Sequence, residues 1–284
     1  MLDLESLVKN VMKTWVLLTS VGFLLAFLAC HLFFKTNTSA QSSVGAQAKP
    51  PPRPAGSPTT FGDFKVLFFA DQSLEEITQK VETTSPAPAD DPSSLFASAL
   101  AESHKGKVEE AKKDLKRVLT IPDGESRIRL WAWKALRELG ERPPANVADE
   151  VHGVVCELHN EAGVGTIAAY SDGRARWLGG QGKVTVWEAP GSDAEISALI
   201  RKLLKSAEPL VKTTLASDKH KSSEPKLNYF RVSILTYGGI HIVEVFGPEI
   251  DEKHPIAPVF IGSVNLLDAL SKRSDGADGR PTPR

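Results

Sequence analysis

Residues 165–188 read GTIAAYSDGRARWLGGQGKVTVWE and hold the clearest strand and turn signals of the chain. Short apolar runs alternate here with two turn sequences, Ser171-Asp172-Gly173 and Gly179-Gly180-Gln181-Gly182. Short strands separated by Gly- and Asp-rich turns are typical of neighbouring antiparallel strands. The stretch therefore predicts three consecutive strands, at 165–170, 174–178 and 183–188.

A strand and a helix flank this stretch. Val151–Leu158 has the composition of a buried strand, and Ser192 with Glu195 forms a capping box that begins a helix. The helix is predicted to cover one side of a sheet, because its apolar residues recur at helical spacing. These residues are Ile196, Leu199, Ile200, Leu203, Leu204 and Leu210.

A hairpin and a last helix complete this part of the chain. Tyr229–Tyr237 and Ile240–Phe246 flank Gly238-Gly239, a two-residue hairpin signal, and a helix is expected at about 263–271. The order is a β-meander, a helix, a β-hairpin and a helix. It predicts an α+β fold, an antiparallel sheet with helices packed on it.

The preceding segment, 61–146, is predicted to be mainly helical. Phe64–Ala70 is expected as a short strand and Ser73–Val81 as a helix. Asp91-Pro92 is a cap and first-turn pair that begins a helical hairpin broken at Gly106. A third helix at 125–139 has apolar residues on two sides, which predicts that it is sandwiched between layers.

The hairpin at 93–122 resembles one tetratricopeptide repeat in the spacing of its small and apolar residues, although no second copy is evident. In the third helix, Trp131 and Trp133 are candidates for a binding hot spot, with core packing as the favoured interpretation.

Thr14–Phe34 is a 21-residue stretch without Asp, Glu, Lys or Arg (TWVLLTSVGFLLAFLACHLFF). A helix of this length reaches roughly 30 Å, the thickness of the hydrocarbon core of a bilayer. Lys13 and Lys35 bracket it. The stretch therefore predicts a single transmembrane helix, with the lipid bilayer as a partner.

Two other interpretations of the N-terminus stay open. A cleaved signal peptide has a shorter apolar core, but Thr38-Ser39-Ala40 offers small residues for cleavage. A lipoprotein signal would use Cys30, although His31–Phe34 continue the apolar run. We favour an uncleaved anchor with a cytoplasmic N-terminus. The uncharged stretch 36–48 then favours a bulk of the chain on the extracytoplasmic (periplasmic) side.

The predicted organisation has five parts. Residues 36–60 are rich in Pro, Ser and Ala, which is typical of a linker that buries no core; a proline-motif ligand is the alternative. The parts are a tail and anchor at 1–35, a linker at 36–60, a helical segment at 61–146, an α+β domain at 147–273 and a disordered tail at 274–284.

Charge and cysteine content exclude several classes of protein. The formal net charge is −1, and residues 1–60 carry +3 while 61–146 and 147–284 carry −2 each. Neither folded segment has the basic excess of a nucleic-acid binder. Two cysteines form neither a disulfide framework nor a zinc site made of cysteines alone.

Two stretches of the chain resemble motifs of catalysis or phosphate binding. Gly179–Lys183 is glycine-rich like a phosphate loop, but Val184 follows the lysine and a strand follows the loop, so a hairpin turn is favoured. Cys156 and His159 suggest a nucleophile and a base, yet on a strand they point to opposite faces.

Four histidines were considered as metal ligands, and none has recognised ligand spacing; they are His152, His159, His241 and His254. We therefore predict no catalytic, cofactor-binding or metal-binding residue. The candidate interaction surface consists of the aromatic residues Tyr170, Trp177, Trp187, Trp131 and Trp133.

Three stretches together resemble a family of uncharacterised bacterial proteins. They are LWAWKALRELGERPP at 130–144, AAYSDGRARWLGGQGKVTVWEAP at 168–190 and LTYGGIHIVEV at 235–245. The resemblance runs over roughly 95–270, and its best motif is Tyr170–Gly173 with Trp187-Glu188. It implies an α+β fold and brings no activity. The strand and helix order is also reminiscent of profilin-like or roadblock-like domains, at the level of fold only.

The function expected from the sequence is that of a single-pass membrane protein. Its α+β module would be non-catalytic and would bind a protein partner. The alternative is an enzyme or a small-ligand sensor whose site is assembled from distant residues.

Overall fold

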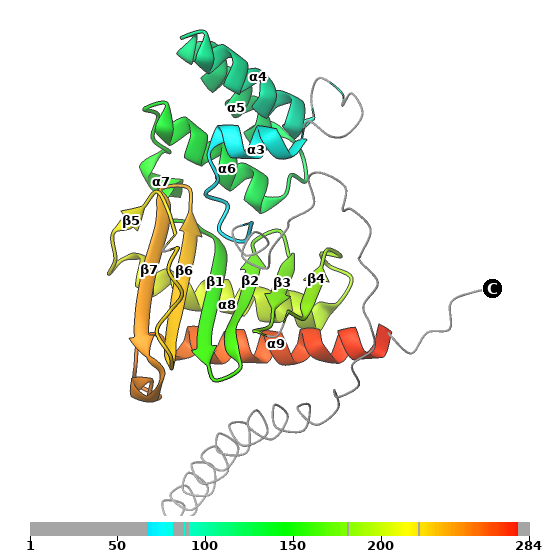
Figure 1. Ribbon diagram of the computed structural model, residues 1–284, viewed down its shortest axis with the longest axis vertical. Coiled ribbons are helices and arrows are strands. Elements are labelled where there is room, and N and C mark those ends of the chain that lie inside the picture. The colour runs from blue at the N-terminus through cyan, green and yellow to red at the C-terminus, as the bar shows by residue number, and fades with distance from the viewer. Residues whose placement is uncertain (1–66, 82–87, 89–90, 181, 221, 278–284) are drawn as a thin grey trace, which may run out of the picture. The chain divides into compact units, whose positions relative to one another are not determined.

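The computed structural model describes residues 67–81, 88, 91–180, 182–220 and 222–277 (Figure 1). The predicted transmembrane segment Thr14–Phe34 and the linker 36–60 lie outside these residues. Within the described part, no helix combines the length and the apolar character that crossing a bilayer requires.

Seven described strands form one antiparallel sheet in the order β4-β3-β2-β1-β6-β7-β5. They confirm the predicted α+β class with its antiparallel sheet. In chain order the strands are β1 (Val151–Asn160), β2 (Gly163–Tyr170), β3 (Ala175–Leu178), β4 (Val184–Trp187), β5 (Ala216–Ser217), β6 (Tyr229–Thr236) and β7 (Gly239–Phe246).

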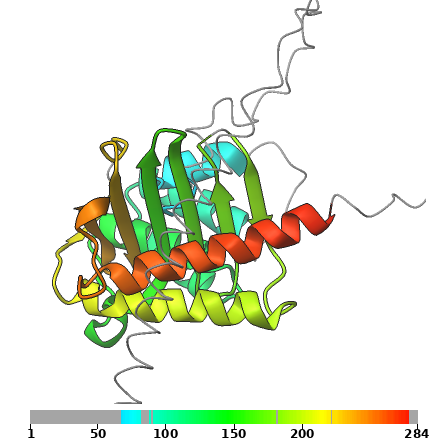
Figure 2. The ribbon, with the colours of Figure 1, turned by 90° about the horizontal axis from the view of Figure 1, so that it is seen from below.

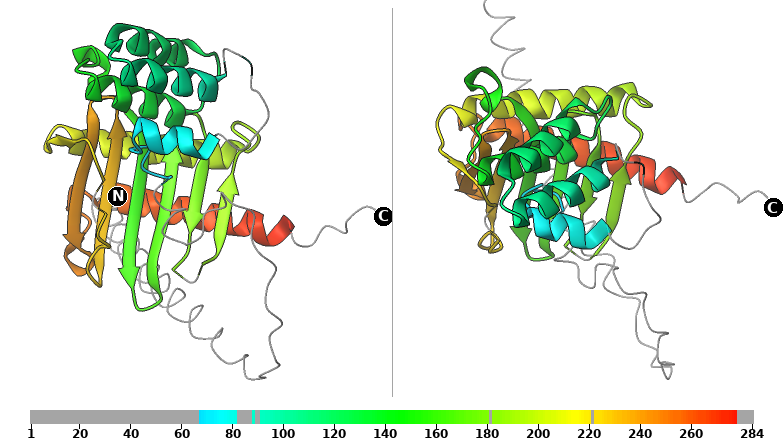
Figure 3. Two further views of the ribbon diagram at one scale, coloured as in Figure 1. Left: turned by 45° about the horizontal axis from the view of Figure 1, so that its top comes forward. Right: turned by 90° about the horizontal axis from the view of Figure 1, so that it is seen from above.

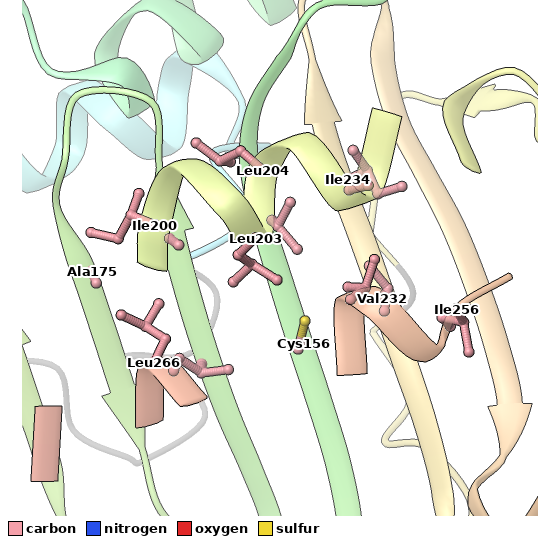
Figure 4. Packing of buried hydrophobic residues seen from close by; sticks show 14 of the residues in the cluster. Cys156, Ala175, Ile200, Leu203, Leu204, Val232, Ile234, Ile256 and Leu266 are labelled. Atoms are coloured by element: carbon pink, nitrogen blue, oxygen red, sulfur yellow. The ribbon is translucent and has the colours of Figure 1, made fainter. Parts of the chain in front are cut away.

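Two helices cover one face of this sheet, which we call the α8/α9 face. They are α8 (Ala194–Val211) and α9 (Ala257–Ala277), which lie side by side across the strands (Figure 2). Leu203 of α8 and Leu266 of α9 pack with Cys156 of β1 and Val232 of β6 in one buried cluster (Figure 4). Because successive residues of a strand alternate between faces, Val155 points the other way, to the opposite face.

The helical segment packs against the opposite face. It contains α3 (Leu74–Val81), α4 (Pro92–His104), α5 (Val108–Thr120) and α6 (Ser126–Glu138). Helix α6 packs on the helical hairpin through Ala135 and on the sheet cluster through Leu130 (Figures 1 and 3). The two-sided apolar pattern of this helix therefore predicted its sandwiched position correctly.

The capping residues of the sequence predicted the N-terminal ends of α3 and α4 correctly, and that of α8 to within one residue. Ser73 and Glu76 form the predicted capping box, with each backbone N–H donating to the side chain of the other. The Asp91 side chain accepts from the Ser93 backbone N–H at 2.9 Å, as a cap before Pro92 should. The cap of α8 lies one residue later than predicted: Asp193, not Ser192, accepts from the first-turn N–H groups.

Two strand predictions need correction. Residues 67–70, the described part of the strand expected at Phe64–Ala70, form a turn, and Ala70 has a φ of 50°, outside the extended region of a strand. The β6–β7 hairpin turns at Tyr237-Gly238, one residue before the predicted Gly238-Gly239, as Thr236 pairs with Gly239.

The structure adds short elements to those expected from the sequence. They are α7 (Ala145–Ala148), β5 and the 3₁₀ turn η1 (Gly247–Glu249). Helix α9 also begins six residues earlier than expected and ends at Ala277, while residues 278–284 lie outside the described part.

Three charged residues on adjacent strands, Glu157, Arg231 and Glu244, form a row on the opposite face, which we call the Arg231 row. Arg231 of β6 is fully buried and lies beside Glu157 of β1, with Nη1 at 3.4 Å from the carboxylate. Its Nε donates to Glu244 of β7 at 3.0 Å, and Nη1 donates to the Ser223 carbonyl at 2.6 Å. The guanidinium therefore joins three adjacent strands and the loop before β6.

Replacing this arginine should destabilise the protein strongly. Arg231→Ala leaves the Glu157 carboxylate in the interior without that guanidinium, which typically costs about 3–5 kcal/mol of unfolding free energy. Guanidinium denaturation followed by tryptophan fluorescence measures the loss. Lys272→Ala, which removes an exposed ion pair with Asp268, is the control and should cost under about 1 kcal/mol. Similar losses of unfolding free energy in both variants would contradict the structural role given to Arg231.

Candidate functional site

The five aromatic residues predicted as an interaction surface are divided by the sheet. Tyr170 lies on the opposite face, whereas Trp177 and Trp187 lie on the α8/α9 face. Trp131 and Trp133 belong to α6. The structure thus brings Tyr170 together with Trp131, and Trp177 together with Trp187, but does not assemble all five.

Tyr170 is a buried residue of the junction between sheet and helices. It has no exposed surface, and its hydroxyl donates to the Phe68 carbonyl at 2.8 Å. The guanidinium groups of Arg127 and Arg176 lie 5.7 and 6.0 Å from its ring centre. Burial raises the pKa of the Tyr170 phenol. These contacts make Tyr170 a packing residue that holds the segment before α3 to the sheet.

The tryptophans of α6 lie between layers and are half-buried. Trp131 donates its indole N–H to the Gln72 side chain and packs against both neighbouring clusters. Trp133 lies 5.8 Å from the ring of Tyr237 at the β6–β7 turn. Both residues therefore contribute to the attachment of the helical segment, in line with the core packing favoured from the sequence.

Trp177 and Trp187 are the aromatic residues next to a sheet edge. Trp177 pairs with Thr185 across β3 and β4, and Trp187 pairs with Ala175. Both rings are partly buried against the α8/α9 cluster, and the Lys183 ammonium lies 5.9 Å from the Trp177 ring centre. We call these two tryptophans the aromatic base of the β4 edge. Among the described strands, β4 is the last one at this end of the sheet.

A network of six charged side chains joins α6 to β3 and the end of β4. Glu125 contacts Arg127 of α6 and Arg176 of β3, the latter at 3.3 Å. Glu188 accepts from the Nε atoms of both Arg176 and Arg174, at 3.0 and 2.8 Å. Arg174 completes the chain at 3.2 Å from Asp172 in the β2–β3 turn.

This network was not predicted from the sequence, which indicated only the turn Ser171-Asp172-Gly173 and a strand at 174–178. A signal was present in the alternation of Arg174 and Arg176 with Glu188 one strand later. Pairing these residues required the register of β3 with β4, which only the structure provides. With three carboxylates and three guanidinium groups the network is neutral, and its geometry suits structural cohesion.

A second polar group surrounds His152 at the start of β1. Its Nδ1 lies 3.4 Å from the Ser171 hydroxyl, and its ring stacks on Tyr237 at 3.8 Å. Ser126 contacts Ser171 at 2.9 Å and exchanges hydrogen bonds with Asp172. Burial, reinforced by the positive charge of Arg129, lowers the pKa of His152 to about 4.

A serine beside a histidine resembles a nucleophile and its base. The hydrogen bond is long, however, and an imidazole with a pKa near 4 is a weak base at neutral pH. The contacts of His152 are instead those of a neutral ring that packs under the β6–β7 turn.

The Cys156–His159 pair and the glycine-rich loop at Gly179–Lys183 have the structural roles favoured from the sequence. Burial raises the pKa of the Cys156 thiol on the α8/α9 face, while His159 on the other face bonds to the Pro225 carbonyl at 2.7 Å. Gly179 donates to the Lys183 carbonyl at 2.8 Å and β4 follows, so this glycine-rich loop is a hairpin turn. In the described residues, no group of three or more His, Cys, Asp or Glu side chains is arranged to hold a metal ion.

A shallow hollow of about 400 Å³ lies along α5. Of its cationic residues, Lys112, Lys116 and Arg117 are in ion pairs with neighbouring carboxylates. Its lining residues are Glu109, Lys112, Lys113, Lys116, Arg117 and Thr120. These come from a single helix, so the hollow lacks the convergent groups of a ligand pocket.

Comparisons of this chain with protein-family models, with curated proteins and with solved structures found no match. The resemblances noted in the sequence therefore stay predictions. The features that define a candidate site are those of this chain alone: the β4 edge, its aromatic base and the charged network behind it.

The low pKa of His152 predicts how the free energy of unfolding changes with pH. Between about pH 6.5 and 4 the unfolded chain binds a proton at this position that the folded chain does not, so stability falls as pH falls through this window. The loss is at most about 3 kcal/mol. In His152→Asn this component should disappear from the unfolding free energies measured between pH 7 and pH 4.5. His104→Asn, at an exposed histidine, should keep the loss of stability that His152 causes in this window.

Proposed function

We propose that this chain is a membrane-anchored, non-catalytic interaction protein whose α+β module binds an extended segment of another protein along β4. The observation that carries the proposal is the open, uncharged edge of this strand. The bilayer would hold the protein through Thr14–Phe34, and the bulk of the chain would lie on the extracytoplasmic (periplasmic) side.

Strand β4 ends the sheet and has unused backbone groups on its outer side. Among the described residues it pairs only with β3. Gly179 donates to Lys183, and hydrogen-bonded pairs alternate along an antiparallel ladder. Lys183, Thr185 and Trp187 therefore direct their backbone groups toward β3. Val184 and Val186 direct theirs away from the sheet, toward an incoming strand.

The side chains of β4 also suit strand addition. The strand reads VTVW, without charge or proline, and Val184 and Val186 are 42% and 48% exposed. Proteins usually protect such edges with charges, prolines or bulges, because an open edge is a template for pairing. At the other end of the sheet β5 has only two residues. Of the two edges, β4 is the one that offers pairing groups and apolar contacts.

Helix α9 supports the same interpretation. Its C-terminal turns extend past β4 in two different views (Figures 1 and 3). A strand added to β4 would therefore lie over α9 on one side. Main-chain hydrogen bonds would supply affinity, and alternate side chains of the partner would supply specificity, as in other cases of strand addition.

A charge on the edge should abolish partner binding without unfolding the module. Val186→Lys puts a charged side chain on the edge strand, beside the side chains of an added strand, which disfavours edge pairing, while an exposed site usually tolerates such a change within about 0.5 kcal/mol. Affinity capture from native membranes with quantitative mass spectrometry should show a partner that wild type retains and Val186→Lys loses. Val108→Lys, at an exposed valine of α5, should retain it. An identical set of captured proteins for all three chains would refute edge binding.

The anchor has its own test. Paired reporter fusions, one active only in the cytoplasm and one only outside it, are placed after Ala48 and at the C-terminus of the full chain. Both positions should give the extracytoplasmic signal, because the apolar segment precedes them. A cytoplasmic signal from both positions would contradict the proposed topology.

A further inference from the structure

The two-helix layer has a solvent side that the proposed partner strand does not use. On α8 and at its C-cap, four cationic residues are exposed on the side away from the sheet: Arg201, Lys202, Lys205 and the cap residue Lys212. Within the described part of the chain, none of the four takes part in an ion pair. By contrast, most cations of α5 are neutralised by neighbouring carboxylates. We call these four residues the basic strip.

The acidic residues of α8 do not cancel this charge. Glu195 is held by Arg273 of α9 at 2.8 Å, and Arg273 also contacts the cap residue Asp193 at 2.9 Å. Glu208 is the remaining carboxylate of the helix. The strip therefore keeps a net positive charge on an exposed helix face.

Helix α9, which packs beside α8, also exposes apolar side chains. Ile261 and Val264 are 40% and 41% exposed, and Pro258 is exposed one turn earlier. The two helices touch at Gly262 and Leu203, where a Cβ atom at position 262 would lie 3.2 Å from Leu203 Cδ1. Because the helices lie side by side on the same face of the sheet, their exposed sides form one surface (Figure 2).

We propose that this surface docks on the anionic headgroups of a lipid bilayer. Each lysine or arginine near an anionic surface favours binding, and small apolar side chains between them enter the boundary between headgroups and acyl chains. The surface combines both features: four cations without an ion pair among the described residues, and three exposed apolar residues on the neighbouring helix.

The sequence favours lipid over an acidic protein as the occupant. This step rests on the proposed function, because Thr14–Phe34 would hold the chain at a bilayer. The described domain begins at Leu67, and the 32 residues between Phe34 and Leu67 can span at most about 110 Å. The domain would thus stay within reach of the membrane, where a weak surface interaction gains a high effective concentration.

Docking on this side would leave the β4 edge open. Strand β4 lies at one end of the sheet that α8 and α9 cover, so a partner strand approaches from the side and not through the docked surface (Figure 2). The membrane would then orient the module for strand addition without competing with it.

The experiment uses the full chain in lipid nanodiscs. Ala198→Cys on the exposed side of α8 carries a fluorophore, Cys30→Ser removes one of the two native thiols, and the other, Cys156, is buried. A lipid with a quencher on its headgroup reports proximity in phosphatidylcholine discs with or without phosphatidylglycerol. Quenching should be strong in the anionic discs only and should weaken as salt is added.

Charge reversal identifies the residues responsible. At about fivefold for each cation lost, Lys202→Glu with Lys205→Glu should reduce the ratio of docked to undocked molecules at least roughly 25-fold in anionic discs. The matched pair Lys113→Glu and Lys116→Glu on α5 makes the same change in net charge and should leave quenching unchanged. Equal quenching in both kinds of disc, or equal effects of both pairs, would overturn the proposal.

Two further outcomes distinguish a failure of the membrane anchor from a failure of lipid docking. A chain that does not remain with the discs after a salt wash would refute the anchor of the proposed function. A chain that remains but shows protection of α8 only in native membranes, and none in purified anionic discs, would assign the surface to an acidic protein and overturn lipid docking.

Discussion

The contact of Glu125 with two arginines joins the helical segment to the antiparallel sheet. Arg127 comes from α6 and Arg176 from β3, and both guanidinium groups lie near the ring of Tyr170. The carboxylate compensates two partly buried cations that would otherwise repel each other across the ring. Because Arg176 is also held by Glu188 after β4, the same charges fix the helical segment, the sheet and the position of its free edge.

The sheet can then carry different tasks on its two sides. Its opposite face is closed by the helical segment and by the buried Arg231 row, so it contributes stability. On the α8/α9 face the helices bury their apolar stripes inward, and the exposed cations of α8 remain available. Strand β4 packs Trp187 against the α8/α9 cluster, while the backbone groups of Val184 and Val186 face outward at the edge. The two binding surfaces that we propose are therefore surfaces that the folded core leaves exposed.

Much of the fold could be predicted because its signals are local. The cap at Asp91, the capping box at Ser73 and the turn at Ser171–Gly173 depend on residues within one turn of each other, and all appear in the structure. The two apolar sides of α6 even indicated its position between layers. Less of the candidate site could be predicted. The aromatic residues were correctly noticed, but nothing in residues 165–188 tells which side of a strand faces helices and which faces another layer.

The amino-acid sequence by itself determined the α+β class, the order of elements and the 21-residue apolar segment, because periodicity, turn residues and length act over short distances. The tertiary structure alone decided that Tyr170 is interior while Trp177 and Trp187 lie on the other side of the sheet. Among the described residues, it also decided that β4 is an edge strand and that the exposed cations of α8 form no ion pair. These properties depend on strand order, register and the packing of distant segments, which are set by the free energy of the whole fold and not by any stretch of it.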